Sequence, residues 1–169
     1  MTWDTRFLAL FDKCLALYRS GSRDYASWYA EADSALLQEI GYQPREFFDF
    51  IEDYGDSGAP SPTTALLIAA ARRDYFHTIQ HGQLSTAQLS PDALPFGHEE
   101  LGGIRRLPRA VVKARAKLRG ELHPDIMYGC GGDRELLDSL KIHPADFLRA
   151  VWAAGDDDQQ LLRWVKAQG

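Results

Sequence analysis

The chain repeats itself at a fixed offset of 100 residues, without a gap. Solenoid repeats are about 20 to 50 residues long, so this longer period indicates a pair of related modules. One module alone would leave an apolar face uncovered, and we therefore expect the two copies to pack together. The recurring residues are Lys13, Arg19, Asp33, Leu36, Leu37, Pro44, Phe47, Gly55 and Asp56, which return as Lys113, Arg119, Asp133, Leu136, Leu137, Pro144, Phe147, Gly155 and Asp156.

The apolar residues of both copies follow a helical period. Spacings of three and four over 5–18 predict a first helix, and its copy begins with Pro108 and ends at Gly120. Asp33 and Asp133 are predicted N-caps of the next helices, 34–40 and 134–140. Further helices are expected after Pro44 and its copy, then over 64–81 and 158–167, with a loop over 53–64.

No segment alternates apolar and polar residues as a half-buried strand does. The predicted fold is therefore all-α, with two tandem, pseudo-symmetric helical modules packed into one globular unit. The first and more degenerate module is expected to span 1–82, a linker rich in glycine and proline 83–103, and the second module 104–169.

Length, composition and net charge indicate a globular protein that neither enters a membrane nor binds nucleic acid. A chain of 169 residues that is 45% hydrophobic can bury one ordinary core without metal or disulfide staples. No apolar run approaches the roughly 20 residues that a bilayer requires, and the N-terminus does not resemble a signal peptide, so we expect a cytoplasmic protein without membrane contact. The net charge of -5 argues against a nucleic-acid partner.

The two copies differ most at the glycine-rich turn that contains Cys130. Glycines let backbone N–H groups converge, and a helix N-terminus stabilises a nearby anion or thiolate. Cys130 is the candidate nucleophile, with His123 as general base and Asp125 orienting it. The alternative is a plain linker between two helices.

A basic helix precedes this turn. Cations are concentrated over 104–120, where no acidic residue occurs, and Arg109, Lys113 and Lys117 lie four residues apart on one face. Such a face suits a compact anion, such as a phosphate ester or a carboxylate. The alternative is that these cations pair with the acidic turns 52–56 and 155–158.

The sequence contains few residues or motifs that indicate a metal site or a cofactor site. His77 and His81 have the i, i+4 spacing of a helical metal pair, and Asp74, His98 and Glu99 could join them. The glutamate of a zincin motif is absent, and so are phosphate-loop, dinucleotide-binding and Gly-x-Ser-x-Gly patterns. We therefore expect neither a metal nor a cofactor.

Three short motifs in the second half carry a family resemblance. They are the Leu-Pro-Arg start at 107–109, the Lys-Ala-Arg-Ala helix at 113–116 and the Tyr-x-Cys-x-x-Asp turn at 128–133. With these motifs the second half resembles the bacterial family known as domain of unknown function 5069, and the first half resembles it only through the internal repeat. The resemblance implies a small helical protein and no particular reaction.

The leading functional hypothesis is a site in the second module for a small anionic ligand or an acidic segment of a partner. A cysteine-dependent enzyme that uses Cys130 and His123 is one alternative, and whether the protein is an enzyme stays open. A non-catalytic scaffold that self-associates, for instance as a homo-oligomer, is another. The predicted ligand-binding residues are Arg109, Lys113, Arg115, Tyr128, Gly131, Gly132 and Asp133.

Overall fold

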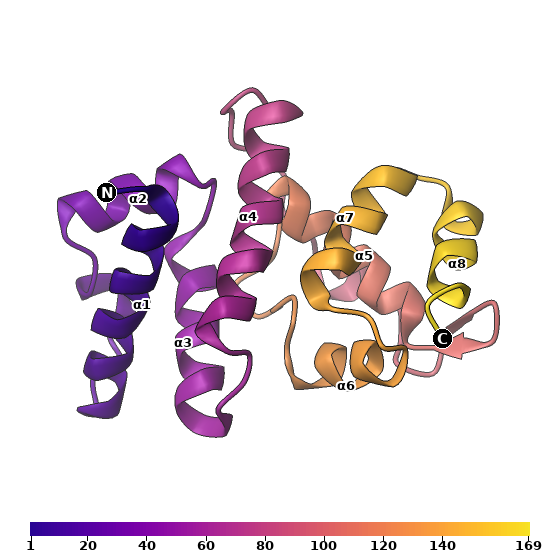
Figure 1. Cartoon of the computed structure of the whole chain (residues 1–169), viewed down its shortest axis with the longest axis horizontal. Coiled ribbons are helices and arrows are strands. Elements are labelled where there is room, and N and C mark those ends of the chain that lie inside the picture. Colours follow the sequence, from indigo (N-terminus) through magenta and orange to yellow (C-terminus); the bar gives the residue numbers. More distant parts are fainter. The chain divides into compact units, whose positions relative to one another are not determined.

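The computed structural model describes all residues, 1–169, and confirms the predicted all-α class (Figure 1). It contains eight α-helices and one pair of two-residue strands. The chain divides into two compact units, Met1–Gln83 and Leu84–Gly169. No helix has the length and apolar character that a membrane-spanning segment needs.

The first unit is built around α1 (Trp3–Arg19), which packs against the other three helices of the unit. These are α2 (Glu31–Glu39), α3 (Pro44–Ser57) and α4 (Pro62–Thr78), and a 3-10 turn, η1 (Tyr25–Ser27), lies between α1 and α2. Phe7 of α1 and Phe47 of α3 meet edge to face, with ring centroids 5.1 Å apart. The apolar residues that recur at helical spacing in the sequence thus form the core of this unit.

The second unit places α7 (Pro144–Ala154) between α5 (Leu107–Arg119) and α8 (Asp158–Lys166), and packs it against both. The helix α6 (Gly131–Ser139) precedes α7, and a 3-10 turn, η2 (Pro91–Ala93), lies near the start of the unit. Leu107, Phe147, Leu148 and Leu161 are fully buried among these helices. Helices α6 and α7 begin 100 residues after α2 and α3, whereas α5 begins four residues after the position equivalent to the start of α1, and α8 spans 9 residues where α4 spans 17. The pseudo-symmetry of the two modules stays a prediction.

Several boundaries differ from the sequence expectation. Both aspartates that were predicted as N-caps lie inside their helices, at the third position, because α2 begins at Glu31 and α6 at Gly131. The Asp33 carboxylate reaches back and accepts a hydrogen bond from Ala30 N at 2.9 Å, as in a capping box. Helix α3 continues through Gly55 into the segment that was expected as a loop.

A short hairpin lies in the segment that the sequence analysis assigned to a linker. Strands β1 (Glu100–Leu101) and β2 (Ile104–Arg105) pair antiparallel, and Leu101 faces Ile104 across the ladder. Gly102 and Gly103 form the turn with φ of 59° and 83°, the left-handed values of a tight two-residue hairpin. The alternation test missed the strands because each contains only two residues.

We predict that Gly102→Ala destabilises the second unit by about 2–4 kcal/mol. A Cβ at this position would collide with the buried side chain of Leu162, and the left-handed backbone adds about 1 kcal/mol. Gly103→Ala is the matched control, because its φ is also positive while no atom lies within 4 Å of the new Cβ. Urea unfolding should show a clearly larger loss for Gly102→Ala, and equal losses would contradict the close approach of Leu162.

Candidate functional site

The start of α6 brings together three residues that the sequence analysis singled out. Lys113 Nζ lies 2.6 Å from Asp133 Oδ2 and donates to Cys130 Sγ at 3.3 Å. Lys113 and Asp133 are buried, with side chains 5% and 8% exposed, whereas Cys130 is half-buried. The Lys113 ammonium of α5 therefore lies between the Asp133 carboxylate and the Cys130 thiol, at a site that is mostly buried from solvent.

The local chain path explains this arrangement. Cys130 has an extended backbone, with φ of −64° and ψ of 170°, and its carbonyl accepts the first hydrogen bond of α6 from Arg134 N. Asp133 lies one turn later, and its Oδ2 also accepts from Gly129 N at 2.9 Å. The Asp133 carboxylate thus ties the turn to the helix and to Lys113 at once.

The first turn of α6 has unused hydrogen-bond donors. The backbone N–H groups of Gly131 and Gly132 donate to no acceptor, and the Cys130 side chain does not cap them. The guanidinium of Arg106 lies so close to Gly132 that a Cβ there would collide with it, and it pairs with Glu135 at 2.9 Å. The helix dipole and the guanidinium contribute positive potential at this turn, and the carboxylates of Asp133 and Glu135 oppose it.

Tyr128 lies next to this turn but faces the core. It is almost fully buried, and its hydroxyl donates to the Pro144 carbonyl at 2.7 Å, which ties the turn to the start of α7. Burial raises the pKa of the Tyr128 hydroxyl well above its ordinary value, and the charge of Asp133 raises it further. Tyr128 is therefore a neutral structural tie at physiological pH.

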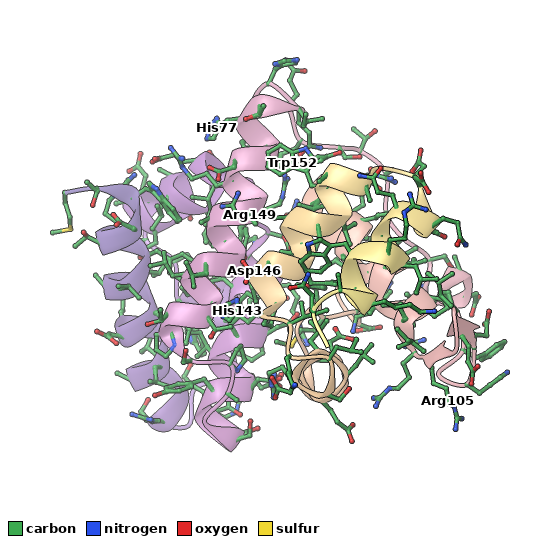
Figure 2. The ribbon with its side chains drawn as sticks, turned by 45° about the vertical axis from the view of Figure 1, so that its right-hand side comes forward. His77, Arg105, His143, Asp146, Arg149 and Trp152 are labelled. Carbon is green, nitrogen blue, oxygen red and sulfur yellow. The ribbon has the colours of Figure 1, made fainter.

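The remaining cations of α5 do not form one exposed face. Lys113 and Lys117 are buried, and Arg109 donates to the Pro95 carbonyl at 3.0 Å. Arg115 donates to the Gly155 carbonyl and to Asp158 at 2.8 and 2.7 Å, as in the alternative of pairing with the acidic turn 155–158. Arg105 of β2 is exposed (Figure 2).

His123 and Asp125 form a pair of their own. His123 Nδ1 accepts from Asp125 N at 3.1 Å and lies 3.7 Å from Asp125 Oδ2. No hydrogen bond joins His123 to Cys130, and the nitrogen that contacts the thiol belongs to Lys113.

The histidines considered as metal ligands are not arranged as the helical spacing predicted. Helix α4 ends at Thr78, and His81 lies beyond it with a left-handed φ of 52°, so His77 and His81 do not share a helical face. His77 Nε2 hydrogen-bonds to the Glu39 carbonyl at 2.9 Å. No group of three or more His, Cys, Asp or Glu side chains lies close enough to hold a metal ion.

The sequence analysis missed a cavity of about 400 Å³ between α7 and α8. Its walls combine small residues of α7, among them Ala150 and Ala153, with Trp164 of α8. Figure 2 labels His143, the residue before α7, and Asp146 and Arg149 of α7, and all three also line the cavity. Small residues at helical spacing opposite a tryptophan were the signal that could have revealed this cavity.

Comparison with known proteins agrees with the predicted resemblance. Residues 95–169 match the family described as Domain of unknown function (DUF5069), and the match includes the Cys130 turn and helices α5 to α8. No curated protein and no solved structure matches the chain.

Proposed function

We propose that the second unit binds a small anionic ligand at the start of α6. The observation that carries this proposal is the pair of unused N–H groups at Gly131 and Gly132 beside the guanidinium of Arg106. Backbone N–H groups at a helix N-terminus form a ready anion site, and a guanidinium adds charge and a second pair of donors.

The surroundings support the same site. Arg106 follows β2 with a left-handed φ of 69°, and its backbone N donates to the Glu99 carbonyl at 2.9 Å. An arginine held in this conformation is strained, and such strain is commonly retained where a side chain must be aimed. Its partner Glu135 is exposed, so the ion pair is weak enough for an anion to compete with it.

Lys113 and Asp133 act in this proposal as positioning residues. They lie beneath the turn, and their ion pair orients Gly129 and Cys130 rather than meeting the ligand. The ligand is a phosphate ester or a carboxylate, because both offer oxygens that accept from two N–H groups and a guanidinium together.

We predict that Arg106→Gln weakens the binding of inorganic phosphate about tenfold, because one charge-assisted contact is lost. Phosphate titrated into isotope-labelled protein should shift the amide resonances of Gly131 and Gly132. Gly132→Ala should also weaken binding, because the added methyl displaces the guanidinium.

Arg105→Gln is the control for Arg106→Gln. It removes the same charge from the neighbouring, exposed residue, so phosphate binding should change less than twofold. Equal weakening by the two variants would mean that phosphate responds only to the general charge of this surface, and the proposal would fail.

A second candidate function uses Cys130 as a nucleophile. Its support is the 3.3 Å contact from Lys113 Nζ, which places a cation beside the half-buried sulfur. Lys113 would act there as a cation and not as the general base that the sequence analysis placed at His123, because an ammonium has no lone pair to accept a proton.

A further inference from the structure

The cavity between α7 and α8 has an apolar wall and a charged rim. Leu161 and Ala154 are buried beneath it, Trp164 is half-buried at its side, and the small side chains of Ala150 and Ala153 leave the space open. Its volume of about 400 Å³ lies within the range of about 300 to 1,000 Å³ that is usual for small-molecule sites.

Two opposite charges stand unpaired at the rim. Lys141 and Asp146 are both exposed, and neither side chain has a hydrogen bond or an ion pair in the structure. Lys141 also adopts a left-handed φ of 56°, at the position where the first copy has Gly41. A lysine there is less favourable than glycine by about 1 kcal/mol.

The other charged and polar groups at the rim are Arg149, His143, Gln160 and Gln168. His143 Nδ1 accepts from Ala145 N at 3.2 Å, which occupies this nitrogen in capping α7. A simple anion in the cavity would meet the Asp146 carboxylate, and a simple cation would meet Lys141 and Arg149. A ligand that carries both a positive and a negative charge can pair with Asp146 and Lys141 at the same time.

We propose that this cavity binds an α-amino acid with an apolar side chain. The ligand carboxylate pairs with Lys141, the ligand ammonium pairs with Asp146, and the side chain packs against Trp164 and the alanines of α7. The site is distinct from the start of α6, because no residue of that turn lines the cavity.

Three probes that share one ring test the two charges separately. They are L-phenylalanine, 3-phenylpropionate, which lacks the ammonium, and 2-phenylethylamine, which lacks the carboxylate. Each is titrated into the isotope-labelled full chain, and the amide shifts of α7 and α8 are followed. We expect L-phenylalanine to bind in the millimolar range and about threefold to fivefold more tightly than either relative, because each lost ion pair is exposed.

Four variants locate the binding. Lys141→Gln should remove the preference over 2-phenylethylamine, and Asp146→Asn the preference over 3-phenylpropionate. Ala153→Trp should abolish binding by filling the cavity, since Ala153 is exposed and lines it. Lys166→Gln, at an exposed position of α8 outside the cavity, should change nothing.

The proposal is overturned if L-phenylalanine gives no saturable shift, or if it binds no more tightly than both relatives. It is also overturned if Ala153→Trp leaves the affinity unchanged, because the probe then binds elsewhere. Equal weakening by Lys141→Gln and Lys166→Gln would likewise overturn it.

Discussion

Lys113→Met destabilises the second unit by about 3–5 kcal/mol, the cost of breaking a buried ion pair by removing one partner. The Asp133 carboxylate would stay buried without its ammonium, and only Gly129 N would still donate to the same oxygen. Methionine keeps most of the aliphatic stem of lysine, so the loss reports the charge rather than a cavity. Urea unfolding followed by circular dichroism measures it.

The pair of Lys13 and Asp33, 100 residues earlier in the chain, supplies the control for this variant. Lys13 and Asp33 form the same pair at 2.5 Å in the first unit, but their side chains are 43% and 21% exposed. Lys13→Met should therefore cost about 1 kcal/mol or less. A loss of similar size in both variants would show that burial does not strengthen the second pair.

The double variant Lys113→Met with Asp133→Leu separates the ion pair from the rest of the turn. Replacing both charges by apolar groups removes the unpaired carboxylate, so part of the lost stability should return. The part that does not return combines the net contribution of the ion pair with the loss of the hydrogen bond from Gly129 N to Asp133, which only the double variant removes. A double variant as unstable as Lys113→Met alone would mean that losing this hydrogen bond costs as much as removing the unpaired carboxylate gains.

The second large effect is expected in thiol reactivity. Cys130 should react with iodoacetamide about 100-fold faster than Cys14 at pH 8, because the thiolate is the reactive form. Burial raises the pKa of the Cys14 thiol to about 12, the charge of Lys13 opposes this rise, and that of Asp33 adds to it. Cys14 is also fully buried, whereas Cys130 is half-buried beside an ammonium.

Each cysteine is measured alone by mass spectrometry, in Cys130→Ser and Cys14→Ser protein. Because the Cys14 thiol is neutral well above pH 8, its rate should keep rising with pH up to about 12, as long as the fold persists. Equal rates for the two thiols would contradict the prediction and remove the support for Cys130 as a nucleophile. Slower alkylation of Cys130 in the presence of phosphate would connect it to the proposed anion site.

The helical class could be predicted from the sequence because helical periodicity is a local property. The predicted first helix, 5–18, corresponds to α1 over Trp3–Arg19, and its apolar positions, such as Phe7 and Phe11, are buried. The Cys130 turn could be singled out for a similar reason, since glycines before a helix identify unused backbone donors.

Predictions from local sequence were wrong where residues distant in the chain contact the segment. Gly55 was expected to lie in the loop 53–64, yet α3 continues through it. The Tyr18 ring of α1 packs so closely against Gly55 that a Cβ there would lie 2.6 Å from Tyr18 Cδ1. Tyr18 also donates to Asp56 at 2.7 Å. Gly155, 100 residues later, ends α7 with a φ of 59°, so the Gly-Asp sequence has different conformations at 55–56 and 155–156.

The sequence alone determined the helical class, the order of the helices and the recurrence of Lys13 and Asp33 as Lys113 and Asp133. Only the tertiary structure decided that Lys113 and Asp133 are buried while Lys13 and Asp33 remain partly exposed, and that α7 and α8 line a cavity that is open to solvent. The physical reason is that a periodic pattern identifies the face of a helix but not what covers it. A helix face is buried by elements that are distant in the chain. Whether a charged side chain is buried in this way determines whether it can bind a ligand or instead stabilises the fold.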